Sequence, residues 1–474
     1  MSLESYFKFK ENNTNSSKEI LAGVTTFLAM AYILAVNPDI LAAAGMPKGG
    51  VFIATALASF VGTMFMAFFA NYPFALAPGM GLNAYFAFTV VLGMGYSWQY
   101  ALLAVFAEGI IFLLLSLTKV REAIFNSIPL PLKTAVSVGI GLFIAFIAMQ
   151  GAHIIVDNNA TLVGFQNFDN NIHNHGICAI LALIGVLVTA WMIHKKVTGA
   201  ILFGILITWI LGIISQLCGL YIISPEANCF SLIPKLDFHT FTNAWRDFIS
   251  VFCALFSPEQ WSLKTGTGEE VAFISGWKLV KSFNFVVIML SFMFVDIFDT
   301  LGTLIGVSTK AGMLDKDGKL PRIKGALLSD SLATMLGAVF GTSTVTTFVE
   351  SASGVAAGGR TGYAAMTTAL LFLLSILFAP IFLAIPPFAT APALIIVGFY
   401  MMTCIVKIDF DDYLNSIPAY IAILAMPFTY SISEGICLGI ICWTLLNFFS
   451  ERRKNISPLM YVLTILFLAK YVVL

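Results

Sequence analysis

Three carboxyl side chains lie inside long apolar stretches of this 474-residue chain, where a charge is costly. Asp296 and Asp299 interrupt FNFVVIMLSFMFVDIFDTLGTLIGV (283–307), and Glu350 lies in TSTVTTFVESASGVAAGGRTG (342–362). A charge at the centre of a bilayer costs about 2.5–3.5 kcal/mol on insertion scales, so each acid indicates a functional site. Asp296 and Asp299 are three residues apart, so they lie on the same face of a helix. The alternative for each acid is a structural bond to a Ser, a Thr or a backbone N–H.

Two apolar stretches are interrupted, and Glu350 lies in the second of them. The first, NYPFALAPGMGLNAYFAF (71–88), contains Pro78 and Gly79, and these residue types disfavour a continuous helix. We expect each segment to form a short extended stretch that leads into a half-helix, with Asn83 and Glu350 near the half-helix starts. Paired interruptions indicate a transporter site. An ordinary kinked helix is the alternative for the first segment.

Other polar residues in apolar stretches have less defined roles. Glu108 has no interruption beside it and is either close to the site or structural. Asn37 and Asp39, in VNPDIL, are expected near a helix end, where polar residues cost little. We find no nucleophile elbow, phosphate loop, zinc-ligand spacing or dinucleotide fingerprint, and the seven cysteines include no CxxC pair. The sequence therefore predicts neither an enzyme, nor a metal site, nor a cofactor.

The elements that position these residues must be membrane helices. Hydrophobic residues make up 59% of the chain and charged residues 11%, whereas a soluble domain carries about 25% charged residues. The mean hydropathy is +0.92. The surface therefore faces lipid, and the net charge of zero gives no support to nucleic-acid binding.

About fourteen stretches are long and apolar enough to cross a bilayer as helices. They lie near 19–43, 50–70, 72–90, 98–117, 132–153, 175–194, 198–222, 281–308, 325–340, 346–360, 361–385, 391–407, 416–431 and 434–450. The C-terminal segment 451–474 is either interfacial or an extra crossing. With the N-terminal tail 1–18 in the cytoplasm, most Lys and Arg residues fall on the cytoplasmic side, as the positive-inside rule requires. The stretch 223–280 is then an external loop, in which an amphipathic helix could form.

The two halves of the chain resemble each other. Residues 42–76 are similar to 309–348, with AGM in both, and 194–212 is more loosely similar to 430–448. Seven helices per half is an odd number, so the halves would be inverted relative to each other, which is typical of secondary transporters. Chance similarity between apolar segments is the alternative. The predicted fold class is an all-α polytopic membrane protein with a seven-plus-seven inverted repeat, broken in helices 3 and 10.

Five motifs carry a resemblance to a known family over nearly the whole chain. They are NPDIL (37–41), ANYPFALAPGMGLNAYF (70–86), FVDIFDTLGTLIGV (294–307), TTFVESASGVAAGGRTG (346–362) and IPAYIAILAMPFTYSISEGI (417–436). In this order they resemble the AzgA-type purine permeases of the nucleobase-ascorbate transporter (nucleobase:cation symporter-2) superfamily.

The resemblance implies a division into two domains and an activity. A core domain would consist of helices 1–4 (19–117) and 8–11 (281–385). A gate domain would consist of helices 5–7 (132–222) and 12–14 (391–450). The activity would be proton-coupled import of guanine, hypoxanthine or adenine across the cell membrane, the bacterial inner membrane if the source is prokaryotic. The partners implied are a purine, the coupling proton and membrane lipid, with a homodimer also compatible.

The resemblance also assigns roles to residues. Asn83, Asp296 and Glu350 match positions that bind or couple substrate, with Glu350 and Asp296 as the proton-coupling groups. Asp299 and Thr300 are added as substrate-binding candidates. Acidic acceptors and one amide can match the polar edge of a purine, and desolvation favours the uncharged form of a carboxyl group. An anion transporter of the same fold is the main alternative, although its site should present Lys or Arg, or two unopposed half-helix N-termini, rather than carboxylates. A channel or a membrane enzyme has less support.

Overall fold

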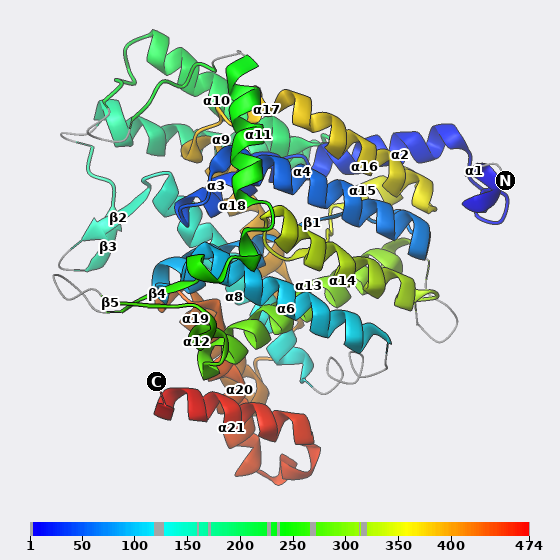
Figure 1. The fold of residues 1–474 in the computed structure, drawn as a ribbon, viewed down its shortest axis with the longest axis vertical. Coiled ribbons are helices and arrows are strands. Elements are labelled where there is room, and N and C mark those ends of the chain that lie inside the picture. Colours follow the sequence, from blue (N-terminus) through cyan, green and yellow to red (C-terminus); the bar gives the residue numbers. More distant parts are fainter. Residues whose placement is uncertain are drawn as a thin grey trace.

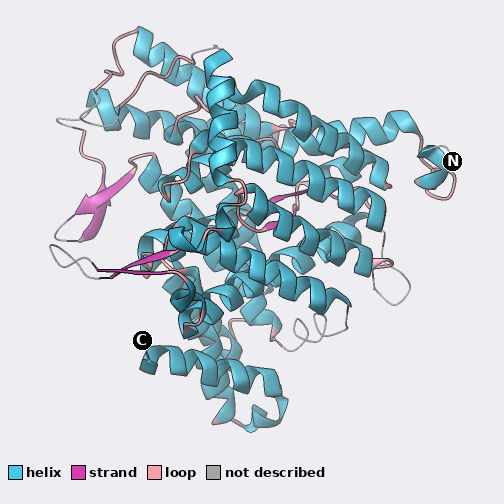
Figure 2. Ribbon diagram, in the orientation of Figure 1, coloured by secondary structure: helices cyan, strands magenta, loops and turns pink. Residues whose placement is uncertain are grey.

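The described part of the protein is a bundle of helices with three short two-stranded pairs (Figures 1 and 2). The computed structural model describes residues 3–117, 128–158, 161–168, 172–224, 229–234, 238–265, 272–311, 313 and 320–473. Within these ranges, nine helices are long and apolar enough to cross a membrane, and five shorter apolar helices accompany them. The prediction of a helical, multi-pass membrane protein is therefore confirmed.

The elements follow one another along the chain in three groups. The first half contains α1 (Leu3–Tyr6), α2 (Ser16–Met30), α3 (Ile33–Ala43), α4 (Lys48–Phe65), η1 (Met66–Ala70), β1 (Leu76–Pro78), α5 (Met80–Ala84), η2 (Tyr85–Gly93), α6 (Trp98–Leu117), α8 (Leu130–Gly151), β2 (Ile155–Asn158), β3 (Leu162–Phe165), η3 (Ile172–Gly176), α9 (Ile177–His194) and α10 (Ala200–Leu217). A connecting region contains α11 (Phe238–Val251), η5 (Ala254–Phe256), η6 (Pro258–Gln260), β4 (Ser262–Thr265), β5 (Ala272–Ser275) and α12 (Trp277–Val280). The second half contains α13 (Phe283–Ala311), α14 (Ile323–Phe340), β6 (Val345–Thr347), α15 (Ser351–Ala356), α16 (Gly362–Ser375), η7 (Ile376–Phe378), α17 (Ala379–Phe382), α18 (Pro387–Met402), η8 (Thr403–Lys407), α19 (Tyr413–Phe428), α20 (Ile432–Phe448), η9 (Glu451–Asn455) and α21 (Pro458–Val473).

The two interrupted segments meet at a small antiparallel strand pair. β1 pairs with β6, and Ala77 lies opposite Thr346. The side chains of both strands are buried. Each strand leads into a short helix, β1 into α5 and β6 into α15, so the expected extended stretches and half-helices are both present. Backbone groups that the breaks release from helical bonding pair with each other, which is what an apolar environment requires.

The first long crossing is also broken. The apolar span Ser16–Ala43 consists of α2 and α3, which are joined by a turn at Ala31 and Tyr32. Pro38 lies inside α3, and a proline cannot donate to the carbonyl one turn earlier. The turn places the side chain of Tyr32 near the middle of this apolar span rather than at one of its ends.

Two groups of helices are distinguished by their packing. In one, α14 packs against α6 and α4, and α16 packs against α2 and α4. In the other, α18 packs against α8, α9 and α10, while α19 packs against α8 and α20. A Cβ atom on Gly141 of α8 would lie 2.6 Å from the carbonyl oxygen of Gly398 on α18. Small residues allow this close approach, as is common between membrane helices.

The two ends of the bundle differ. The β2–β3 and β4–β5 pairs lie at one end, which we call the hairpin end, and the N-terminus lies at the opposite side of the molecule (Figure 1). Phe7 and Phe9 of the N-terminal tail are buried in a cluster with Ala67 and Ala365. The tail is therefore packed onto the bundle, and it covers the end opposite to the hairpins.

Candidate substrate-binding site

The β1–β6 pair brings the starts of the two half-helices together. Asn83 is the fourth residue of α5 and is fully buried, and its side-chain oxygen accepts a hydrogen bond from Ser343, two residues before β6. Glu350 occupies the position directly before α15. Both residues therefore lie where the interruptions placed them, at the starts of half-helices. The backbone N–H groups at a helix start also carry partial positive charge.

Glu350 is held by a tyrosine that the sequence did not single out. The hydroxyl of Tyr32 donates to Oε1 of Glu350 at 2.7 Å. Tyr32 comes from the turn between α2 and α3 and is 1% exposed, whereas Glu350 is only partly buried. A single tyrosine in an apolar stretch looks like a core residue, so no local pattern indicated that it contacts the site.

Asp299 joins the same group of residues. It is partly buried and lies near enough to Glu350 and Tyr32 to interact with both electrostatically. A Cβ atom on Gly79 would lie 3.4 Å from Oδ2 of Asp299 and 2.7 Å from Cγ2 of Thr346. Glycine at position 79 thus lets α13 and β6 approach the start of α5. Asp299 and Glu350 consequently gather beside the two half-helix starts.

Asp296 belongs to a different, fully buried network. The hydroxyl oxygen of Thr300 lies 3.0 Å from Asp296, 3.0 and 3.1 Å from the two carboxyl oxygens of Asp330, and 2.6 Å from the hydroxyl of Thr346. All four residues are at most 1% exposed. The network ties α13 to α14 and β6. Asp296 and Thr300 therefore differ in burial from the partly exposed pair Asp299 and Glu350, while Asp330 and Thr346 of the network lie close to Asp299 and Gly79 respectively.

Asp330 was missed, although a signal for it existed. It is an acid inside the apolar stretch 325–340, which is the criterion that singled out Glu108. Its carboxyl group contacts Thr300 and acts electrostatically on Asp299, so it links the buried network to the group around Glu350.

Two other polar residues, Glu108 and Asn37, connect neighbouring helices to the segment that leads into β6. Thr344 donates to Oε2 of Glu108 at 3.0 Å, so Glu108 links α6 to the entry of β6. The Asn37 amide donates to Thr55 at 2.7 Å and to Thr342 at 2.9 Å. The expectation that Asn37 lies near a helix end was wrong. It lies in the middle of α3 and is fully buried, where its amide nitrogen bonds Thr55 of α4 and Thr342 of the segment before β6.

The described part of the chain contains no group of three His, Cys, Asp or Glu side chains that could hold a metal ion. The site thus consists of carboxyl groups, an amide, a phenol and half-helix starts. Such a set can donate to and accept from the polar edge of a neutral ligand, and it can exchange protons.

The chain belongs to a family of membrane permeases. Residues 17–438 match the model of the Permease family, which comprises the nucleobase-ascorbate transporters. The resemblance drawn from the five motifs is therefore confirmed, and the chain is not an enzyme.

Three relatives show where in this family the chain falls. It is 46% identical to a putative permease of Methanocaldococcus jannaschii, over 100% of this chain and 98% of the relative. It is 42% identical to the guanine/hypoxanthine permease PbuG of Bacillus subtilis, over 100% of both chains. It is 37% identical to the adenine permease AdeP of Escherichia coli, over 99% of this chain and 96% of the relative.

Solved structures with a similar fold are much more distant in sequence. The transmembrane domain of a cyanobacterial bicarbonate transporter, BicA, aligns with a TM-score of 0.60 at 13% identity, over 89% of this chain and 97% of that chain. The murine anion transporter Slc26a9, in its inward-facing state, aligns with a TM-score of 0.60 at 12% identity, over 91% and 68%. These likenesses concern the fold alone.

Proposed function

We propose that the protein is a proton-coupled importer of purine nucleobases: guanine, hypoxanthine or adenine. The base would bind between Asn83, Asp299 and Glu350, beside the two half-helix starts. The main structural support is that the β1–β6 pair brings the starts of α5 and α15 together, with Asp299 of α13 close to Gly79 at the start of α5. Relatives named guanine/hypoxanthine and adenine permeases, aligned over the full chain, support the choice of substrate class.

The chemistry of the group suits a neutral base. A purine presents ring N–H donors beside ring nitrogen and carbonyl acceptors, so it needs acceptors and at least one donor. Asp299 supplies acceptors, and the Asn83 amide can supply a donor as well as an acceptor. Tyr32 occupies Oε1 of Glu350, which leaves the second oxygen for the base. A site built for polar groups rejects analogues that lack them by a large factor.

Proton coupling would follow from the chemistry of Glu350. In the protonated form its carboxyl group can donate to a ring nitrogen of the base as well as accept from Tyr32. Base binding and protonation then favour each other, and this coupling is reciprocal by thermodynamic necessity. Loss of the proton to the cytoplasm would weaken binding and release the base.

Asp296 and Thr300 act as positioning residues in this proposal. Their buried network with Asp330 fixes the rotation of α13 about its axis, and this rotation turns Asp299 towards Gly79. Asp296 shares that network with Asp330, so it is kept as a second proton-coupling candidate.

An anion transporter of the same fold remains the alternative. The structural neighbours include proteins described as bicarbonate and anion transporters. The groups beside Glu350 and Asp299 are, however, a phenol and a further carboxyl group. Negative charge there would repel an anion, so this chemistry favours a neutral base.

The proposed topology places the N-terminus in the cytoplasm of a cell-membrane protein and the hairpin end outside. The two packing groups support the division into core and gate domains, and the β1–β6 pair supports the inverted repeat.

We also propose that α21 is a fifteenth crossing. It packs on α20, and Tyr471 near its end is hydrogen-bonded to Glu434 in the first turn of α20. The two helices are therefore antiparallel along most of their length.

A binding measurement tests the substrate class directly. Purified protein should bind labelled hypoxanthine, and unlabelled guanine or adenine should displace it, while bicarbonate and sulfate should not. Asp299→Asn should lose most of this binding, and a matched Asp→Asn change at exposed Asp409 should keep it. Displacement by the anions, or equal binding in both variants, would refute the proposed site.

A further inference from the structure

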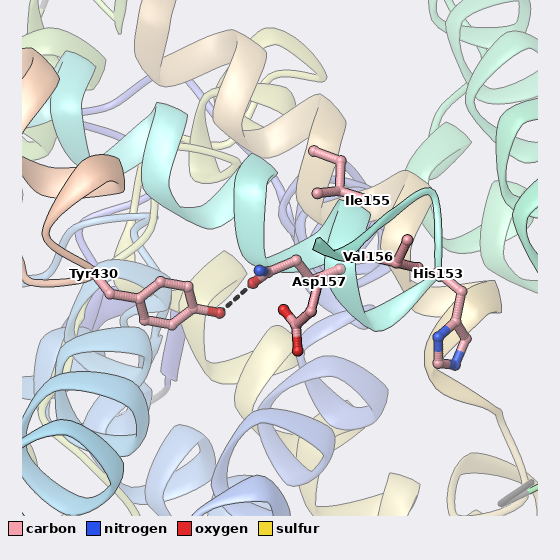
Figure 3. Close-up of a pocket in the computed structure, with 6 residues that line it drawn as sticks. His153, Ile155, Val156, Asp157 and Tyr430 are labelled. Carbon is pink, nitrogen blue, oxygen red and sulfur yellow. Dashed lines mark hydrogen bonds between the residues drawn. The ribbon is translucent and has the colours of Figure 1, made fainter. Parts of the chain in front are cut away.

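A cavity opens at the hairpin end of the bundle. It has a volume of about 570 Å³ and is lined by Gln150, His153, Ile155, Val156, Asp157 and Tyr430 (Figure 3). Ligand pockets commonly have volumes of about 300–1,000 Å³. Most of the lining groups are polar, and Tyr430 presents an aromatic ring. The cavity is therefore large enough, and of suitable character, to admit a flat polar molecule.

Tyr430 bridges two parts of the bundle at this cavity. It lies in the turn between α19 and α20, and its hydroxyl is hydrogen-bonded to the side chain of Gln150, at the end of α8 (Figure 3). Its ring centroid lies 5.5 Å from that of Phe143 and 5.9 Å from that of Phe146, both on α8. On the other side it lies 6.1 Å from the ring of Phe88.

Phe88 connects this contact with the proposed site. It belongs to η2, which continues α5 directly, and it follows Asn83 by five residues. Tyr430 thus lines the cavity and packs both against η2, which continues the half-helix that carries Asn83, and against α8.

The backbone of Tyr430 adopts an unusual conformation. Its φ angle is +55°, in the left-handed region that non-glycine residues seldom occupy. Such a conformation persists only where the surroundings hold it, and it is frequent in segments that switch between states. Tyr430 directly follows the C-terminal end of α19, where the Ser431 N–H bonds the Met426 carbonyl, and the hydrogen bond to Gln150 and the three ring contacts add to this hold.

We propose that Tyr430, held by Gln150, is the gate residue and a determinant of substrate size on the hairpin side of the transport path. When the hydrogen bond breaks, the ring leaves the space between Phe88 and α8, and the cavity joins the site. The ligand that passes is a neutral planar heteroaromatic base, because the ring can stack on its face and the Gln150 amide can bond its edge. The identity of this ligand rests on the proposed function, whereas the gating itself does not.

Thiol labelling tests the gate without any substrate. Phe88→Cys is placed in a variant whose exposed Cys218 is replaced by serine, and the protein is reconstituted in nanodiscs. Labelling of position 88 by a polar thiol reagent is followed by peptide mass spectrometry. Adding Gln150→Ala, which removes the hydrogen bond and keeps the ring, should accelerate labelling by about threefold to tenfold. Adding Tyr430→Ala should accelerate it further.

Tyr471 provides the matched control. It is another hydrogen-bonded tyrosine, paired with Glu434 of α20. Phe88→Cys combined with Tyr471→Ala should be labelled at the rate of Phe88→Cys alone. Equal labelling rates of position 88 in the Tyr430→Ala and Tyr471→Ala backgrounds would overturn the gate. If Tyr430→Ala does not fold, the comparison of Gln150→Ala with Tyr471→Ala decides the question in the same way.

Transport by the Tyr430→Ala variant tests the size selection. It should carry purines with bulky ring substituents that the unmodified protein excludes, while equilibrium binding of hypoxanthine stays the same. An unchanged substrate range would refute that part of the proposal. If labelling behaves as expected but no purine binds to any variant, the gate stands and the proposed function fails.

Discussion

Replacing Glu350 by glutamine separates binding from energy coupling. The Gln side chain has nearly the shape of Glu, and its carbonyl oxygen can still accept from Tyr32, which donates to Oε1 of Glu350 at 2.7 Å. Its NH₂ group donates as a protonated carboxyl group would, but it cannot release a proton. Glu350→Gln should therefore fold and bind a purine, yet it should not respond to a proton gradient.

The size of the effect follows from the driving force. One proton carried down a gradient of one pH unit supplies about 1.36 kcal/mol, which is a tenfold concentration ratio. In proteoliposomes with a gradient of about two pH units and the membrane potential clamped to zero, the unmodified protein should accumulate hypoxanthine up to about 100-fold. Glu350→Gln should reach no more than equal concentrations on both sides.

Counterflow exchange is the control for a folded, binding-competent variant. Exchange of labelled for unlabelled hypoxanthine needs no net proton movement, so Glu350→Gln should retain it. Binding by this variant should also lose most of its pH dependence. Accumulation against a gradient by Glu350→Gln would refute the coupling role, and Asp296, Asp299 and Glu108 would then be tested in its place.

Three further predictions concern binding and topology. Asp299→Asn should weaken purine binding by about tenfold to 100-fold, the range for a hydrogen bond to a charged group. Asp296→Asn should mainly lower the melting temperature. The reverse pattern in binding and thermal assays would exchange the roles of the two residues. Tyr32→Phe should raise the dissociation constant about threefold to tenfold by releasing the carboxyl group that it orients, and unchanged binding would make Tyr32 structural. A cysteine introduced at Leu162 should react with an impermeant reagent added outside, and one introduced at Arg453 should react only from the cytoplasmic side. The opposite result would invert the topology.

The interruptions were predictable because they depend on local chemistry. Proline and glycine around Pro78 and Gly79 exclude a regular helix whatever surrounds them. Asn83 could therefore be placed near a half-helix start from the sequence alone. Glu350 could be placed in the same way from the Thr/Val run and the small residues of 342–362. The resemblance to purine permeases was visible for the same reason, since several of its motifs lie around these breaks.

The roles of the two aspartates could not be separated from the sequence. Residues three apart lie on the same side of a helix, so both Asp296 and Asp299 could face the substrate. In the proposed site, which of them does so depends on the rotation of α13, which the contacts of Thr300 with Asp296 and Asp330 hold. The sequence shows no trace of that contact.

The contributions of Tyr32 and Asn37 depend on tertiary structure in a similar way. Tyr32 contacts Glu350 only because the turn between α2 and α3 lies opposite the start of α15. Asn37 was expected near a helix end, and it is instead buried against Thr55 and Thr342. In both cases a polar partner comes from a distant segment, which local sequence patterns do not reveal.

The most direct test of the central claim is uptake by the purified protein in proteoliposomes. Labelled hypoxanthine, guanine, adenine, xanthine and uracil are offered singly, with and without an inward proton gradient. We predict gradient-dependent accumulation of at least one of hypoxanthine, guanine and adenine, and little uptake of uracil. Failure to transport any purine, or purine uptake that is the same with and without the gradient, would contradict the proposed function.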